Sequence, residues 1–262
     1  MELREAAAAL GVHYQTAYAW VRQGSLPARK RGRGYEVEDA DVRALAAQRS
    51  AGSPPAREVA VRDWPAQADQ LYAAIADGEE THARRWLDRL AAGATLTDLC
   101  ERVIAPALHR IGDDWAAGRV SIAQEHRASA ICERLIARHA AQPPGRPRGS
   151  AVVATPPGER HGLPALIAAA CLREDRWRVH HLAADLPVPE VTRLADAVDA
   201  DLVVFSSATR QGARRAQAAA REVAAANPRP LVLTGQPGDS VRDLIQLARD
   251  SRHPGAHQPH LA

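Results

Sequence analysis

Two short segments rich in proline and glycine divide this 262-residue chain, and they constrain its fold more than any other feature. The first, residues 50–58, begins Ser-Ala-Gly-Ser-Pro-Pro, and the second, residues 142–149, reads Gln-Pro-Pro-Gly-Arg-Pro-Arg-Gly. Proline and glycine interrupt both helical and strand periodicity. We therefore expect a linker at 50–58 and separate domains at 1–49, 59–141 and 150–250, each long enough for its own core. The polar tail, 251–262, is expected to be disordered.

The composition is that of a folded chain. Hydrophobic residues make up 46% and charged residues 25%, which excludes an intrinsically disordered protein. Cys100, Cys132 and Cys171 lie far apart and form no CxxC pair, so we interpret them as buried thiols in a reducing cytoplasm. The sequence has no recognisable signal peptide and no apolar run near the roughly 20 residues of a membrane span. We expect a cytoplasmic protein without a membrane partner.

The last domain alternates short apolar runs with amphipathic stretches. The runs that predict strands are Ala151–Thr155, Val179–Leu182, Leu202–Ser206 and Pro230–Thr234. Each is followed by a loop and then a helical pattern, which is typical of a parallel sheet with helices on both faces. Ligands of such folds bind at the carboxyl ends of the strands.

The N-terminal 49 residues contain the parts of a winged helix-turn-helix, in order. Leu3–Leu10 predicts a short helix, Gly11-Val12 a turn, and Tyr14–Gln23 a second helix that would enter the major groove. A basic, glycine-containing loop then separates two short extended pieces, which is the pattern of a wing. A third helix is predicted over Asp39–Ala47. These residues resemble the MerR and excisionase families of winged-helix proteins.

This unit predicts operator DNA as a partner, although the net charge of only +3 would not do so by itself. Phosphates respond to local clusters of cations. The expected DNA-binding side chains lie on the second helix and on the wing: Thr16, Tyr18, Arg22, Arg29, Lys30, Arg31 and Arg33. Phosphate contacts position a protein without reading sequence, so the operator is not predicted.

The middle domain is helical and places an aromatic ring, a carboxylate and an imidazole at one end. Thr95 and Asp98 predict a capping box that opens a helix ending near Trp115, and Ser121 with Gln124 predicts a second one. The second helix carries Glu125 and His126 in its first turns. A short connection makes the two helices antiparallel, so Trp115, Glu125 and His126 should meet at one end and could hold a flat, partly polar ligand.

A histidine follows the first strand of the last domain. The loop Pro156–Pro164 places His161 at the carboxyl end of that strand. Imidazole is a good ligand for transition metals. Glu159 can accept the other ring N–H, which would fix the tautomer and raise the basicity of the ring.

Together these motifs resemble the CarH/LitR family of adenosylcobalamin-dependent photoreceptor regulators. Trp115 followed after nine residues by Glu125-His126 looks like the motif that contacts the upper face of the corrin in that family. Glu159 and His161 resemble the acid and histidine of the cobalamin signature Asp-x-His-x-x-Gly. The other matching positions are the small residues Ser206, Ser207 and Gly235.

The resemblance implies a multi-domain fold: a MerR-like winged helix-turn-helix, a four-helix-bundle cap, and a flavodoxin-like, Rossmann-type α/β cobalamin-binding domain. It implies that Trp115 and Glu125 contact the adenosyl group, and that His161 is the lower cobalt ligand. His126 would take the upper position after photolysis, and Ser206, Ser207 and Gly235 would line the nucleotide tail.

Three departures from the family pattern affect the last domain. Pro164 replaces the glycine of the signature, Gly235-Gln236 replaces the usual Gly-Gly, and the chain stops before the fifth strand that such domains normally have. They put the affinity for the nucleotide tail and the closure of the sheet edge in doubt, and the cobalt ligand less so.

The function implied is a light-dependent repressor rather than an enzyme. Adenosylcobalamin-bound protein would assemble as a homo-oligomer, a tetramer by resemblance, and bind operator DNA in the dark. Light would break the Co–C bond and release the DNA. Three alternatives stay open: a corrinoid carrier for a methyltransferase; a regulator that senses B12 level, redox state or a second chromophore such as a bilin; and a DNA-binding protein with an empty cofactor domain.

Overall fold

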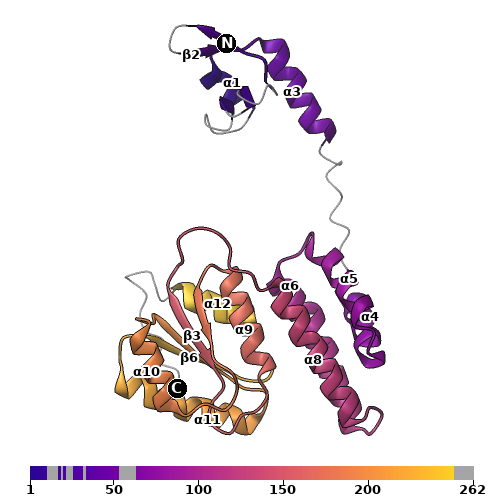
Figure 1. The fold of residues 1–262 in the computed structure, drawn as a ribbon, viewed down its shortest axis with the longest axis vertical. Coiled ribbons are helices and arrows are strands. Elements are labelled where there is room, and N and C mark those ends of the chain that lie inside the picture. The colour runs from indigo at the N-terminus through magenta and orange to yellow at the C-terminus, as the bar shows by residue number, and fades with distance from the viewer. Residues whose placement is uncertain (11–16, 19, 22–25, 32–33, 53–62, 251–262) are drawn as a thin grey trace. The chain divides into compact units, whose positions relative to one another are not determined.

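The computed structural model describes residues 1–10, 17–18, 20–21, 26–31, 34–52 and 63–250. The chain divides into two compact units, Met1–Arg62 and Asp63–Ala262, shown in Figure 1. Several expectations lie outside the described residues. They concern the Gly11-Val12 turn, the side chains of Thr16, Arg22 and Arg33, most of the linker, and the tail 251–262.

The described residues of the first unit contain the first and third predicted helices and the wing hairpin. Its elements are α1 (Leu3–Ala9), β1 (Arg29–Arg31), β2 (Gly34–Glu36) and α3 (Asp39–Gly52). Residues 17–18 and 20–21 are helical. The two strands pair antiparallel, with Lys30 opposite Tyr35. A small core holds the unit together, formed by Leu3, Ala6, Ala7, Ala17, Leu26, Val37 and Val42.

Helix α3 is longer than the sequence predicted. It was expected to end at Ala47, but it continues to Gly52 and so takes up the first residues of the expected linker. The segment Gln48–Ala51 contains no helix breaker. Pro54 disfavours the helical conformation for the residue before it, so the helix can continue almost to that point.

The second unit begins with a helical bundle. Its elements are α4 (Trp64–Asp77), α5 (Glu80–Ala91), α6 (Leu96–Leu99), the π-helical turn η1 (Cys100–Ile104), α7 (Ala105–Ala116) and α8 (Ile122–His139). The expected helix from Thr95 to Trp115 is therefore one rod, α6–η1–α7, with a π turn inside it. Such turns are rare and interrupt the regular hydrogen-bond ladder.

One of the two predicted capping boxes forms in full. The Ser121 hydroxyl accepts from the Gln124 amide, and the Gln124 side chain accepts from the Ser121 amide at 2.9 Å. Thr95 caps α6 by accepting from the Asp98 amide at 3.0 Å. The Asp98 carboxylate in turn accepts from the Thr95 hydroxyl at 2.7 Å, so the two residues are joined by reciprocal hydrogen bonds.

A four-stranded parallel sheet follows the bundle, in the order β4-β3-β5-β6. The strands are β3 (Ser150–Ala154), β4 (Arg178–His181), β5 (Leu202–Ser206) and β6 (Leu231–Gly235), within one residue of the predicted runs. The helices between and after them are α9 (Leu163–Glu174), α10 (Val188–Ala197), α11 (Arg210–Ala226) and α12 (Val241–Asp250). The described residues end with α12 at Asp250, so the expected lack of a fifth strand concerns residues outside them.

The helices cover both faces of the sheet. Alternate residues of a strand point to opposite faces, and β3 divides accordingly: Val153 packs with α9 and α12, while Val152 packs with α10 and α11. The core that contains Val153 continues without a break into the bundle. Figure 1 shows α8 and α9 side by side at this junction. No helix in the described ranges is both long and apolar enough to cross a membrane.

One carboxylate joins the bundle to the sheet. Glu174, the last residue of α9, accepts from the amides of Leu96 and Thr97 at 2.6 and 3.0 Å and from the Thr97 hydroxyl at 2.8 Å. Those amides are donors that the first turn of a helix leaves unsatisfied. A negative charge there is further stabilised by the helix dipole.

We expect Glu174→Ala to lower the free energy of unfolding of the second unit by about 2–3 kcal/mol, because it removes a helix cap and several charge-assisted hydrogen bonds. Urea unfolding followed by circular dichroism measures the change. Glu222→Ala on the exposed side of α11 is the matched control. Equal stability of the two variants would contradict the role given to Glu174.

Candidate cofactor site and DNA-binding surface

The loop after β3 holds an exposed histidine against a buried carboxylate. Glu159 is 3% exposed. Its Oε1 lies 2.5 Å from His161 Nδ1 and accepts from the His161 amide at 3.1 Å. The His161 side chain itself is 63% exposed. With Nδ1 engaged, Nε2 is the ring nitrogen available to a metal, as expected from the sequence.

Two residues that the sequence did not single out complete this arrangement. The Thr209 hydroxyl donates to the second oxygen of Glu159 at 3.1 Å and accepts from the Gly212 amide at 2.9 Å. A Cβ on Gly212 would lie 2.1 Å from Glu159 Oε2. Only glycine allows α11 to begin this close to the carboxylate. Thr209 is recognisable as a helix cap, but its partner lies 50 residues away along the chain.

Glu159 is held in its ionised form. Burial alone would raise the pKa of this carboxyl, but the hydrogen bonds from His161 and Thr209 outweigh burial and lower the pKa below its usual range. Glu159 is therefore a carboxylate at neutral pH. It favours an N–H on Nδ1 of His161, and so a lone pair on Nε2.

The small residues at the ends of β5 and β6 lie next to each other. Ser206 and Ser207 are buried. The amide and the hydroxyl of Ser207 both donate to the Gly235 carbonyl at 3.0 Å. A Cβ on Gly235 would meet the Ser206 hydroxyl at an ordinary 3.5 Å. The three residues thus tie the carboxyl ends of two strands together with little side-chain bulk.

The end of the bundle presents unusually exposed apolar side chains. Trp115 is 48% exposed and Ile122 is 57% exposed. Beside them, the Glu125 carboxylate lies 2.6 Å from His126 Nδ1 and accepts from the Ser129 hydroxyl at 2.8 Å. The His126 side chain is 73% exposed. These residues could cover one face of a flat ligand.

The two groups of residues lie at the same end of the second unit. Glu174, at the carboxyl end of α9, binds the start of α6, so the bundle rod begins beside the end of α9 and runs toward its beginning. The rod has 4, 5 and 12 residues in its three parts, whereas α9 has 12. At 1.5 Å per residue the rod is therefore longer than α9, and Trp115 lies near the end of the rod that is far from Glu174.

The chemistry of these residues fits a cobalt-containing corrin. His161 supplies one imidazole with a fixed tautomer on the side of the sheet, which suits a transition metal. Trp115 and Ile122 supply apolar surface on the side of the bundle. No group of three or more histidine, cysteine, aspartate or glutamate residues gathers to form a metal site of its own among the described residues. A metal brought by a cofactor and bound by one histidine is consistent with this.

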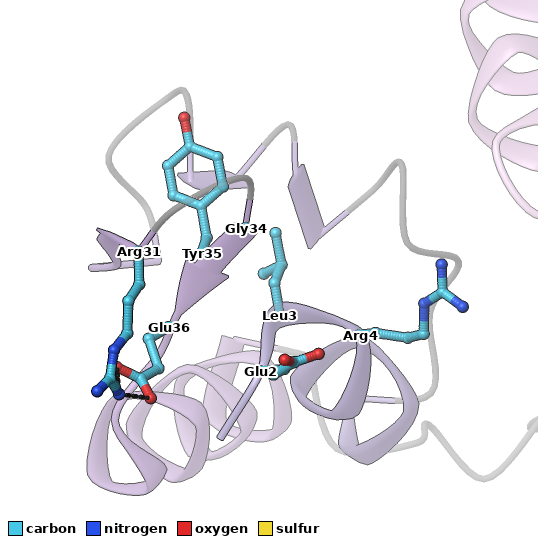
Figure 2. Close-up of a pocket in the computed structure, with 7 residues that line it drawn as sticks. All are labelled: Glu2, Leu3, Arg4, Arg31, Gly34, Tyr35 and Glu36. Carbon is cyan, nitrogen blue, oxygen red and sulfur yellow. Dashed lines mark hydrogen bonds and ion pairs between the residues drawn. The ribbon is translucent and has the colours of Figure 1, made fainter.

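On the first unit, the described basic residues of the wing are exposed. Arg29, Lys30 and Arg31 form β1, and all three are exposed. Arg31 also donates to both carboxylate oxygens of Glu36, at 2.9 and 3.1 Å. Figure 2 shows this ion pair in a shallow pocket. The residues drawn there are Glu2, Leu3, Arg4, Arg31, Gly34, Tyr35 and Glu36.

The second helix of this unit is described only in part. Tyr18, expected to contact DNA, is half-buried, and its ring packs edge-on against Tyr35 with the centroids 5.7 Å apart. Trp20 and Val21 are half-buried against the core. A role of Tyr18 at DNA remains a prediction.

The chain matches three family models in sequence order. Residues 1–50 match a helix-turn-helix domain, and residues 67–138 and 149–250 each match a B12 binding domain. The HTH-type transcriptional repressor CarH of Myxococcus xanthus is 29% identical over 236 residues, which cover 79% of each chain. The repressor CarA of the same organism is 25% identical over 223 residues, or 79% of this chain and 76% of CarA.

A solved structure has the fold of the second unit. The monomethylamine corrinoid protein of Methanosarcina barkeri aligns with a TM-score of 0.56 at 12% identity, over 70% of this chain and 97% of that one. At this identity the likeness shows the fold alone.

The chain is therefore a transcriptional regulator that combines a helix-turn-helix domain with both parts of a B12-binding module, and cobalamin is its cofactor. In sequence and in domain order it is similar to the repressors CarH and CarA.

The lowered pKa of Glu159 predicts how stability depends on pH. A carboxyl whose pKa is lower in the folded state contributes stability above its unfolded pKa, near 4.3, and loses it as the pH falls through the folded pKa. Glu159→Gln should therefore be less stable than the natural chain by about 1–3 kcal/mol at pH 7. The difference should shrink as the pH falls below about 4.

Urea unfolding of cofactor-free protein between pH 3 and 7 measures this difference. Glu190→Gln, which removes an exposed carboxylate paired with Arg193, is the control. A Glu159→Gln deficit that does not change with pH would show that the variant fails through packing and not through charge.

Proposed function

We propose that this regulator is an adenosylcobalamin-dependent light sensor that represses transcription in the dark. The observation that supports it is the position of the exposed Trp115 end of the bundle. It lies at the same end of the unit as His161, in a chain that also carries a helix-turn-helix domain. The similarity to CarH and CarA, which are named repressors, favours repression.

Each group of residues has a distinct part in this proposal. His161 would hold the cobalt through Nε2, with its ring oriented by Glu159. Trp115 and Glu125 would contact the adenosyl group, and His126 would be available as a cobalt ligand once that group has left. Ser206, Ser207 and Gly235 line the path of the nucleotide tail. Adenosylcobalamin supplies a cobalt–carbon bond that light can break.

The bundle would transmit the signal because its exposed end, with Trp115 and Glu125, would form the surface that contacts the adenosyl group. Loss of that contact would change how the end of the bundle is held against the sheet domain. A ligand can shift an assembly only by binding its states differently. We propose that the cofactor-bound dark state is a homo-tetramer with high affinity for operator DNA, and that the illuminated state is not. No turnover is proposed.

Size-exclusion chromatography with absorbance detection tests the proposal, on full-length protein mixed with adenosylcobalamin in the dark and after green illumination. Co-elution of corrinoid, with a light-induced change in both spectrum and elution volume, is the expected result. Binding without a change in assembly would favour a corrinoid carrier or a sensor of B12 level. If no corrinoid co-elutes, the domain either binds another ligand, such as a bilin, or binds none.

The same experiment on His161→Ala examines the lower ligand. We expect weaker retention of cobalamin, by about tenfold or more, or a spectrum in which His161 no longer ligates the cobalt. His109→Ala, which removes an exposed histidine on α7, should behave as the natural chain. Unchanged affinity and spectrum in His161→Ala would remove His161 from the site.

The exposed cations of the wing predict a separate effect on the affinity for DNA. Replacing Arg29 and Lys30 together with alanine should weaken binding to all duplexes alike and reduce the slope of log K against log salt by about 1 for each phosphate that is no longer neutralised. Fluorescence anisotropy at several salt concentrations measures the slope. Replacing Arg84 and Arg85 together with alanine, at two exposed positions of α5, controls for the same loss of two charges. A loss of affinity restricted to one sequence would indicate base reading instead of phosphate binding.

A further inference from the structure

Asp114 is a buried carboxylate directly before the exposed Trp115. It is 7% exposed. One oxygen accepts from the hydroxyl of Tyr72 on α4, and the other accepts from Nε of Arg119 at 2.7 Å. A single side chain on α7 thus binds a second helix and the turn that leads to α8. Neither the site described above nor its comparison with relatives assigns it a role.

The backbone of Asp114 holds the same turn. Its carbonyl accepts from the amides of Arg119 and Val120 at 2.8 and 3.2 Å. Within the turn, Gly118 has a φ of 72°, in the left-handed region that favours glycine. Its amide donates to the Trp115 carbonyl at 2.9 Å. Backbone and side chain together therefore fix how α7 ends and where α8 begins.

The electrostatic surroundings keep Asp114 charged. The hydrogen bond from Tyr72 and then that from Arg119 lower the pKa of the Asp114 carboxyl, and the bond between Tyr72 and Asp114 raises the pKa of Tyr72. Arg110 lies 3.8 Å above the Tyr72 ring and is itself held by Asp69 at 2.7 Å. A buried carboxylate with several donors is costly to disturb, because removal of one partner leaves the others unsatisfied.

Trp115 needs this support because little of the protein surrounds it. About half of its surface is open, so side-chain packing cannot fix its position as it does for a core residue. The ring is placed mainly by the backbone on which it sits. Glu125 and His126 are placed by the first turns of α8, which begin where the Asp114-bound turn ends.

We propose that Asp114, with Tyr72 and Arg119, is a positioning residue that sets Trp115 against Glu125 and so determines the preference of the site for the adenosyl group. This inference rests on the proposed function, because it assigns a cause to adenosyl recognition. Asp114 does not touch the cofactor. It acts through the α7–α8 turn, and it prepares the surface before the ligand arrives.

Hydrogen exchange of the cofactor-free full chain tests the positioning directly. In Asp114→Asn, the amides of residues 118–120 should exchange about tenfold faster than in the natural chain, since one charge-assisted hydrogen bond is worth that factor or more. Asp69→Asn is the matched control, because it breaks a carboxylate–arginine pair between the same two helices without contacting the turn. Similar exchange in the two variants would overturn the positioning role.

Titration in the dark with adenosylcobalamin and with hydroxocobalamin then measures the preference. We expect Asp114→Asn to bind adenosylcobalamin about tenfold more weakly. Its affinity for hydroxocobalamin should change less than about twofold, because the His161 side of the site is intact. Tyr72→Phe should lose part of the preference for adenosylcobalamin over hydroxocobalamin. Arg119→Gln should also lose part of that preference, whereas Arg119→Lys should keep it. The Arg119 side chain is largely exposed, so neither change at this position disturbs the core.

The outcomes separate this inference from the proposed function. If the natural chain prefers adenosylcobalamin and Asp114→Asn keeps that preference, only the role of Asp114 is wrong. If the natural chain binds both cobalamins equally, adenosyl recognition fails, and the role of Asp114 in it fails as well. Equal weakening for both cobalamins in Asp114→Asn would indicate general destabilisation and would also overturn the proposal.

Discussion

The proposed cofactor site depends on the junction between the bundle and the sheet. In that proposal each half supplies one face of the site, so the two must be held in register. Glu174 provides that register by binding the first amides of α6 from the end of α9. Continuous packing of α8 against α9 then extends the junction toward His161. A carboxylate that binds the first amides of a helix fixes both the direction of the helix and its distance from the carboxylate. Apolar packing alone is less directional.

Sequence reasoning predicted most of the elements because it depends on local signals. Apolar runs placed all four strands within one residue, and Ser121 with Gln124 marked the start of α8. It missed the extension of α3 because a linker composition was weighed above the absence of a breaker before Pro54. The pairing of Glu159 with His161 was predicted because the two residues are only two positions apart along the chain.

The partners of these groups could not be predicted because they come from distant parts of the chain. Glu174 meets Leu96 across 78 residues, and Thr209 meets Glu159 across 50. Gly212 appears as an ordinary helix residue until the fold places it against a carboxylate. A sequence pattern reports residue types and spacing. It does not report which elements a fold brings together, and the fixed geometry of a site arises from those long-range interactions.

Both halves of the proposed site meet the same physical requirement in the same way. A ring that is to contact a cofactor has to be exposed, and exposure removes the packing that would fix it. In each half, a buried carboxylate close to the ring along the chain supplies the order: Glu159 for His161, and Asp114 for Trp115. Each carboxylate receives donors from a second element, Thr209 in one case and Tyr72 in the other. Burial of a charge is costly unless it is fully hydrogen-bonded, so this arrangement resists partial disorder. It leaves the rings accessible while restricting where they can go, which is what recognition of a rigid, flat cofactor requires.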